Sequence, residues 1–386
     1  MSEAKKLTRT NWRNSFSVTG KPRITDTTFK IDAQSQKSSW IYNSMGFSVD
    51  CGEKHGNVWV ELMGGYSPDN NYPIYAHGKD ENGRDDFSKQ ILVDWDDREK
   101  EEILDEIGEM CFLTIGLQRT SEGKVYRQKF LHAYDAIKYV KDHLNKDMTV
   151  NVGGNLEYSV YNGKVQVRKT INRIVLIENQ EEAVPSAKFT QTVLLDKDSA
   201  SLKNADKDKG VIYVDTRVLD YVKEINGVEI KGYYPYNVQF EFPMDFSNQD
   251  QCKKIIDKVF KVKKGVTQIT FEGEFVESGA AVQPTYDDLP DDIKDLIDMK
   301  LWSMEDALKK CATNGSRERR MILTKPIWSM VGDDDNKTPV LQKFEEQYQE
   351  EDLIFDCVST NDETPWEDDD DAGSADDSDM SWLDNL

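Results

Sequence analysis

The chain has 386 residues, 38% of them hydrophobic and 10% aromatic, which is enough for two ordinary domains with packed cores plus extensions. It contains no apolar run of about 18 residues and no apolar segment near its start, so the sequence predicts neither a transmembrane helix nor a signal peptide. The five cysteines are odd in number and lack C-x-x-C spacing, which predicts free thiols in a reducing compartment. We therefore expect a cytoplasmic protein that does not contact a membrane.

The net charge of −23 is unevenly distributed. Residues 333–386 hold 20 acidic and 2 basic side chains, a net of −18, which leaves only −5 for the rest of the chain. Within that rest, residues 1–30, 124–173 and 250–265 each carry a clear excess of Lys and Arg. We interpret these stretches as basic patches that the overall charge conceals, although ordinary mixed surface charge is the alternative.

The first strands are predicted shortly after the N-terminus. Residues 1–28 are polar and basic and predict an arm. An aromatic-rich pattern of period two then predicts short strands at 29–32, 40–51 and 57–66. Residues 67–109 hold 14 acidic against 5 basic side chains in mostly loop-like sequence, and predict an acidic insertion that ends in a short helix.

A strand–helix–hairpin order follows the insertion. Apolar runs at 110–117 and 125–134 predict strands, and 135–144 predicts a helix. Asn162-Gly163 between two alternating segments is a strong β-hairpin signal. Three strands, a helix and a two-stranded hairpin are the plan of a five-stranded OB barrel. The predicted fold class is therefore mainly β with inserted helices, with an OB domain over 29–180.

A second, similar unit is predicted after a linker at 181–188. Residues 189–331 alternate between strands and a helix at 251–262, and a glycine again lies inside the strand that follows the helix. This order of elements suggests a second OB-like domain that arose by internal duplication. The alternative is that two unrelated β-domains share it.

The C-terminal residues 332–386 are predicted to be disordered, because they cannot bury enough apolar surface to offset their ordering entropy. Glu363 to Leu386 contain ten acidic residues and neither Lys nor Arg, yet they end in apolar side chains. We interpret this tail as a hook whose acidic residues steer toward a basic groove while its apolar tip docks, rather than as a plain solvated tail. The predicted partner-binding residues are Asp376, Asp377, Asp379, Trp382, Leu383 and Leu386.

No catalytic signature is present. The chain lacks the common nucleotide, hydrolase and zinc-protease motifs, and its four histidines are scattered. Asp94, Asp96 and Asp97 suit helix capping and solvation better than Mg²⁺ binding. We therefore expect a non-enzyme without cofactor or metal.

Basic and aromatic side chains on the predicted strands suit single-stranded nucleic acid instead. A basic groove can follow the phosphate backbone while aromatic rings stack on bases without reading their sequence. Each aromatic residue alone could equally pack in the core, so the prediction rests on the group. The candidate binding residues are Trp40, Tyr42, Trp59, Tyr126, Arg127, Lys129, Tyr158, Tyr161, Lys164, Arg168, Lys169 and Arg173.

The block from Phe29 to Ile177 and the tail DDSDMSWLDNL together resemble the single-stranded DNA-binding proteins of bacteria and, more closely, of bacteriophages. The text VNVGGNLEYSVYNGKVQVRKTINRIVLI is similar to the fourth and fifth strands of that family. This chain is longer than the single-barrel bacterial members, and it ends in Trp-Leu-Asp-Asn-Leu where theirs end in Pro-Phe. A monomer or dimer is therefore favoured over their tetramer.

The resemblance implies a protein that coats single-stranded DNA during replication, recombination or repair, in the host cytoplasm if it is viral. It also implies that the tail recruits a polymerase, helicase, primase or recombinase, and competes with DNA for the basic groove. Two alternatives remain from the residues alone. One is an acidic protein-interaction or DNA-mimic protein, and the other is a metal-dependent nuclease.

Overall fold

A computed structural model of the chain describes residues 7–69, 73–161, 163–225, 228–278, 281–282, 289, 291–299, 301–304, 307, 313–314, 318–331 and 338–354. These residues are mostly β-strand, joined into a large mixed sheet whose pairings are consistent with an OB-like fold. Among them, no helix is long and apolar enough to cross a bilayer.

The first half of the chain, here called the first unit, closes five strands into a ring. β1 pairs with β3, β3 with β4 and β9 with β1, all antiparallel. β10 completes the ring, antiparallel to β9 and parallel to β4. The helix α2 lies between the third and fourth strands of this ring in sequence. The bounds are β1 (Asn14–Arg23), β2 (Phe29–Gln34), β3 (Ile41–Asp50), β4 (Asn57–Tyr66), β7 (Leu113–Arg119), β8 (Val125–Phe130), α2 (Ala133–His143), β9 (Val150–Tyr161) and β10 (Lys164–Leu176).

The second unit closes a ring with the same connections. β11 pairs with β13, β13 with β14 and β15 with β11, all antiparallel. β18 is antiparallel to β15 and parallel to β14. Its helix, α3, again precedes the fourth strand of the ring. The bounds are β11 (Ser186–Leu195), β12 (Ala200–Asp206), β13 (Val211–Ile225), β14 (Val228–Pro243), α3 (Gln249–Ile255), η3 (Ile256–Phe260), β15 (Val266–Ser278) and β18 (Glu318–Pro326).

The two rings agree in register as well as in order. Gly154 of β9 faces Phe16 of β1, and Gly273 of β15 faces Phe189 of β11. Both rings also contain a bulge at the same place. Asn172 is left unpaired between Ile171 and Arg173, and Thr324 between Leu323 and Lys325. A shared bulge is a specific feature, because it inserts one residue at one position of the ladder.

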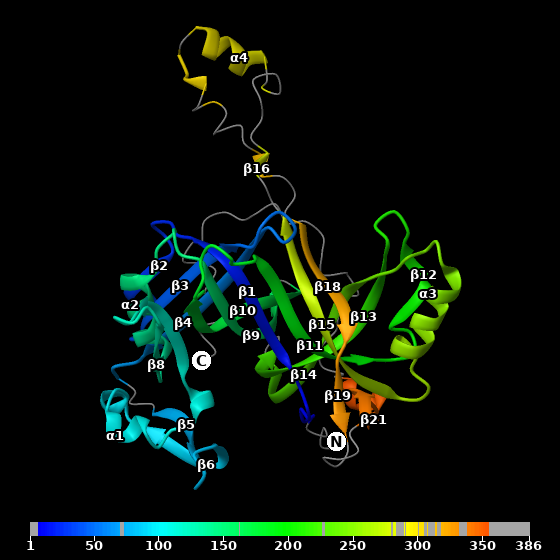
Figure 1. The fold of residues 1–386 in the computed structure, drawn as a ribbon, viewed down its shortest axis with the longest axis horizontal. Helices are drawn as coiled ribbons and strands as arrows, with labels where there is room; N and C mark the ends of the chain where they lie inside the picture. The colour runs from blue at the N-terminus through cyan, green and yellow to red at the C-terminus, as the bar shows by residue number, and fades with distance from the viewer. Residues whose placement is uncertain are drawn as a thin grey trace.

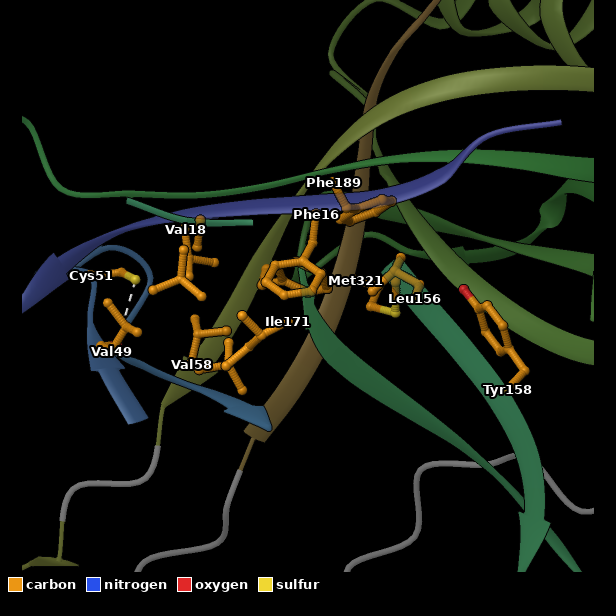
Figure 2. Close-up of a cluster of buried hydrophobic side chains, with 14 of the residues drawn as sticks. Phe16, Val18, Val49, Cys51, Val58, Leu156, Tyr158, Ile171, Phe189 and Met321 are labelled. Carbon is orange, nitrogen blue, oxygen red and sulfur yellow. Dashed lines mark hydrogen bonds between the residues drawn. The ribbon is translucent and has the colours of Figure 1, made fainter. Parts of the chain in front are cut away.

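The two units join side by side through their first strands (Figure 1). β1 and β11 are antiparallel neighbours, and Phe16 pairs with Phe189. Both phenylalanines belong to one hydrophobic core that runs through both units, and Figure 2 shows them together with Val18, Val58 and Met321. The alternating apolar residues of the strands supply this core, as the period-two pattern requires.

The insertion between β4 and β7 contains more structure than its sequence predicts. A hairpin of β5 and β6 packs on a small core of Ala76, Val93, Ile107 and Leu131, beside the first unit in Figure 1. The expected helix is present but only four residues long. The bounds are β5 (Ile74–Lys79), β6 (Asp85–Val93), η1 (Trp95–Asp97), α1 (Glu101–Leu104) and η2 (Glu109–Cys111).

The N-terminal boundary differs from the prediction of an arm over 1–28. Asn14–Arg23 form β1, which lies in the middle of the sheet between β11, β3 and β9. The sequence conceals this strand because only Phe16 and Val18 interrupt its polar residues. Arg9 is also fixed, since its guanidinium donates to Leu219 O and forms an ion pair with Asp220. β2 pairs with β3 outside the ring, so it is not the first barrel strand.

The other predicted boundaries also shift. β11 begins at Ser186, inside the predicted linker 181–188. Residues 338–354 belong to the fold rather than to a disordered tail, because β21 pairs with β15 and Tyr348 donates a hydrogen bond to Thr8 O. Residues 355–386 lie outside the described part. The remaining elements are β16 (Ala281–Val282), α4 (Asp291–Asp298), β17 (Thr313–Asn314), β19 (Trp328–Val331), β20 (Thr338–Leu341), β21 (Lys343–Tyr348) and η5 (Glu350–Leu353).

Candidate nucleic-acid interface

The outer face of β4 presents an aromatic side chain beside a carboxylate. Val58, Val60 and Leu62 point into the core and are buried, so the residues between them point outward. Trp59 is 41% exposed, and its indole N–H donates to Glu61 Oε2 at 3.3 Å. The ring lies against Gly46 of the neighbouring strand, where an added Cβ would be 2.5 Å from it. Gly46 therefore makes room for a broad aromatic side chain on this face.

Arg168 of β10 extends the same outer face across the strand junction. Its Nε lies 3.6 Å from Glu61 Oε1, next to the parallel pair of Glu61 and Thr170. The register of the β9–β10 hairpin is continuous from Lys164 to Ile171, so Lys164 shares the face of Arg168, as does its cross-strand partner Tyr161. Lys164 lies about 13 Å further along the strand. The structure thus groups four predicted residues on one surface, here called the first outer face: Trp59, Tyr161, Lys164 and Arg168.

The second unit repeats the charged part of this arrangement. Arg320 of β18 donates to both carboxylate oxygens of Glu241 of β14. Glu241 pairs with Ile322 as Glu61 pairs with Thr170, and each arginine precedes its strand's pairing residue by two positions. Tyr213 of β13 lies opposite Glu241, at the position that Gly46 occupies in the first unit. Gln239 lies two residues before Glu241 on β14, on the same face, because Val238 and Phe240 are buried. We call Tyr213, Gln239, Glu241 and Arg320 the second outer face.

Three of the predicted binding residues are buried. Tyr42 is 3% exposed and stacks under Trp40 with ring centroids 4.8 Å apart, so only the partly buried Trp40 of this pair reaches the surface. Tyr158 is 4% exposed, and its hydroxyl donates to Gln191 Oε1 at 2.9 Å. Burial raises the pKa of the Tyr158 hydroxyl well above its usual range. Neither buried tyrosine can stack on a base in this arrangement.

Lys169 is the third buried residue, and it connects the two units. Its ammonium forms a buried ion pair with Glu277 of β15 and lies 4.7 Å from the ring centroid of Phe275. Glu277 also accepts the backbone N–H of Trp59. Tyr158 likewise reaches the second unit, since its N–H donates to Asp220 Oδ2. These two residues stabilise the junction between units rather than a nucleic-acid surface.

The remaining predicted residues lie on a separate part of the first unit. Tyr126, Arg127 and Lys129 belong to β8, which β7 separates from β10. Tyr126 is exposed, and Lys129 forms an ion pair with Glu109 of the insertion at 2.5 Å. Arg173 and Lys129 both pair with Thr114, so they lie about 10 Å apart across β7. Arg173 and Lys129 form a basic row that borders the first outer face.

Sequence reasoning missed the second outer face. The glycine in the strand after each helix is one anchor for an alignment, since Gly154 faces Phe16 and Gly273 faces Phe189. The glycines alone do not align β14 and β18 with β4 and β10 of the first unit. The reason is that 39 residues separate β15 from β18, whereas two separate β9 from β10. The predicted tail residues Asp376, Asp377, Asp379, Trp382, Leu383 and Leu386 lie outside the described residues.

A family model named YorF matches residues 77–267, from β5 into the start of β15, which is slightly less than half of the chain. No curated protein matches the sequence. One similar solved structure is the wild-type single-stranded DNA binding protein from Thermus aquaticus, at 8% identity and a TM-score of 0.30, covering 84% of this chain and 96% of that one. A deletion mutant of the same protein is 11% identical with a TM-score of 0.30, covering 69% and 87%. These scores are too low to carry an argument, so function is argued from the residues of this chain.

Proposed function

We propose that this chain binds single-stranded DNA without sequence preference, through the outer faces of two tandem OB-like units. The observation that carries the proposal is the repetition of one arrangement in both rings. In each, an arginine of the fifth ring strand lies over the third strand, and an aromatic residue lies beside it on the second or third strand. The second and third strands are the face with which OB folds bind oligonucleotides.

The chemistry of these faces suits a flexible polyanion. Trp59, Tyr161 and Tyr213 offer rings on which any base can stack, and Arg168, Lys164 and Arg320 offer cations for phosphates. The carboxylates Glu61 and Glu241 hold the two arginines in place, at the cost of weakening the positive potential. Arg173 and Lys129 extend the basic surface toward the insertion.

In this proposal, the two units arose by an internal duplication. The shared ring order, the shared bulge and the equivalent Glu–Arg pairs support it. Two linked binding faces raise affinity by effective concentration, because the second face engages a strand that the first already holds. The proposed role is coating single-stranded DNA in phage or bacterial replication, recombination or repair, with residues 355–386 recruiting partner proteins.

Fluorescence anisotropy of labelled oligo-dT and of a matched duplex tests the proposal. The full chain and a truncation after residue 354 should be compared over a salt series. Truncation after 332 would remove β21, which belongs to the fold. We expect preference for the single strand, a steep salt dependence, and tighter binding by the truncated chain.

A truncated chain that ignores oligo-dT at low salt would contradict the proposal. In that case the acidic surface becomes the active part, and the chain is an interaction or DNA-mimic protein. Degradation of the oligonucleotide with Mg²⁺ or Mn²⁺ would instead indicate a nuclease. Replacing Trp59 and Tyr213 by alanine in turn shows whether both faces contribute, since each loss should weaken binding if both units engage the strand.

A further inference from the structure

The insertion brings a cysteine, a histidine and a carboxylate together. Cys111 Sγ lies 3.2 Å from His77 Nδ1 and 3.8 Å from His77 Nε2, and Nε2 lies 2.7 Å from Asp85 Oδ1. The three residues come from η2, β5 and β6, and the thiol is separated from the imidazole by 34 residues of sequence. A nucleophile within hydrogen-bond reach of a base, with the base oriented by a third group, is the general geometry of an activated nucleophile.

The orientation of the imidazole is fixed from several sides. A Cβ added at Gly108 would lie 2.7 Å from His77 Nε2 and 2.5 Å from Asp85 Oδ1, so only glycine leaves room for both. Asp85 Oδ1 also accepts the backbone N–H of Met110 at 2.9 Å. That N–H, and secondly the bond from His77, hold the pKa of the Asp85 carboxyl below its usual value. Asp85 is therefore ready to stabilise a protonated imidazole.

The thiol is partly enclosed, because Cys111 packs against the small core of the insertion and its sulfur accepts the backbone N–H of His77 at 3.4 Å. Cys111 and His77 are only partly buried, and the ring of the exposed Phe87 packs against His77 at 4.4 Å between centroids. The nearby charges are largely paired. Glu109 of η2 lies between Lys79 of β5 and Lys129 of β8, and Lys89 of β6 faces Glu106. None of these pairs occupies the sulfur.

Two other cysteines in the described ranges have quite different environments. Cys51 is buried, and its thiol donates to Val49 O, as the dashed line in Figure 2 shows. Burial raises the pKa of the Cys51 thiol to about 12. Cys252 is also buried, with its thiol on Asp245 O. Both should be unreactive in the folded protein, so they serve as internal controls.

We propose that Cys111, His77 and Asp85 form a reactive thiol site that undergoes thiol–disulfide exchange with small disulfides. His77 Nδ1 takes the proton of the Cys111 thiol, and Asp85 stabilises the imidazolium. The thiolate attacks one sulfur of R–S–S–R, the S–S bond breaks, and the other sulfur leaves as RS⁻ with the bonding electron pair and is protonated by solvent. The product is a mixed disulfide on Cys111, and no further oxidant is needed. This inference does not depend on DNA binding.

The test measures the reaction of the folded chain with an aromatic disulfide, 5,5′-dithiobis(2-nitrobenzoate), between pH 5.5 and 9. The full chain carries Cys311→Ser and Cys357→Ser, since those two cysteines lie outside the described residues. We expect one released thiolate per chain, abolished by Cys111→Ser. At pH 6 the rate should exceed that of the His77→Gln variant about tenfold, because the neighbouring imidazole accepts the thiol proton as the sulfur attacks.

The pH profile supplies a readout that a purely structural role would not change. His77→Gln should follow an ordinary thiol with a pKa of about 8.5, and Asp85→Asn should fall between it and the parent. A parent profile that already follows an ordinary thiol would overturn the proposal, and so would a folded chain whose Cys111 does not react. The parent profile decides the matter even where a variant fails to fold.

Discussion

Phe16 and Phe189 pair with each other across the antiparallel junction of β1 and β11, and each also faces a glycine of its own ring. Because the two phenylalanines are equivalent in the two rings, the junction has local twofold character centred on this pair. The same relation brings each unit's ring against the other, through Lys169 with Glu277 on one side and Tyr158 with Asp220 on the other.

The glycines opposite these phenylalanines should respond differently to substitution. A Cβ at Gly273 would lie 2.1 Å from the Phe189 ring, whereas one at Gly154 would lie 1.9 Å from the backbone oxygen of Thr170. Each alanine variant should lose about 1–3 kcal/mol in urea unfolding. Phe189→Leu should rescue Gly273→Ala with a coupling of about 0.5–3 kcal/mol. Phe16→Leu should not rescue Gly154→Ala, and equal rescue of both would contradict the difference.

Trp59→Ala should weaken oligo-dT binding by about 1–3 kcal/mol, which is about fivefold to over a hundredfold in Kd, because it removes a stacking ring. Anisotropy titrations at constant salt measure this loss. Trp328→Ala is the matched control, since Trp328 is exposed on β19 and is not among the residues of either outer face. A similar loss in both variants would mean that the effect is not specific to the outer face.

Glu61→Gln should strengthen DNA binding several-fold. The substitution removes the carboxylate charge whose oxygen lies 3.6 Å from Arg168 Nε, so the first outer face should attract phosphates more strongly. The slope of log Kd against log salt should steepen by about 0.7 for the added phosphate contact. Glu102→Gln changes the net charge equally, on the exposed surface of α1. If both variants gain the same affinity and slope, only the net charge matters.

Removing one partner of the buried pair of Lys169 and Glu277 should lower the free energy of unfolding strongly, whereas replacing both by apolar residues should lower it much less. Lys169→Met alone should cost about 3–5 kcal/mol of stability, because it leaves Glu277 as an uncompensated buried charge. Adding Glu277→Leu should recover much of the loss. Chemical denaturation of both variants gives the comparison, and a double variant less stable than Lys169→Met would show that the charge of Glu277 is held by other groups.

His132 should make stability depend on pH in weak acid. Burial lowers the pKa of its imidazole to about 4, below the usual value of about 6.5. The unfolded chain therefore binds the proton first, so stability is complete above pH 6.5 and falls as the pH drops toward 4, by at most about 3 kcal/mol.

The matched variant for this prediction is His132→Asn. His132 Nδ1 caps α2 by accepting the N–H of Tyr134 at 3.2 Å, and asparagine can keep that cap without titrating. The difference in unfolding free energy between the parent and the variant should therefore change between pH 6.5 and 4. A constant difference would mean that His132 does not take up a proton over that range on unfolding.

The sequence allowed most strands to be predicted, because period-two patterns survive in β3, β4, β9, β13 and β15. It concealed β1, since the alternation of apolar and polar residues spans only Ser15 to Thr19 and is followed by Gly20, Lys21, Pro22 and Arg23. The order of elements predicted a barrel, but it did not show which residues close the ring. Strands β4 and β10 meet through a single parallel residue pair, Glu61 with Thr170, which leaves no local trace in the sequence.

The candidate site was predicted only in part, because the sequence does not show which side chains are buried by distant parts of the chain. Period two shows that Trp40 and Tyr42 share a face, but it does not show which face meets the core. A lysine is usually a surface residue, so the sequence predicts that Lys169 is exposed. It is buried because it forms an ion pair with Glu277, 108 residues away. The contact between Cys111 and His77 likewise depends on the fold of the insertion, so scattered histidines gave no reason to expect it.

The central position of β1 also determines when the sheet can form during synthesis. β1 leaves the ribosome first, yet its partners β9 and β11 begin at Val150 and Ser186. Tyr348, which binds Thr8 O, comes later still. Long sequence separations make such pairings slow, because the loop must close before any contact rewards it. The nascent chain thus leaves an edge of β1 unpaired until β11, which ends at Leu195, has emerged, which makes this stage prone to misassembly.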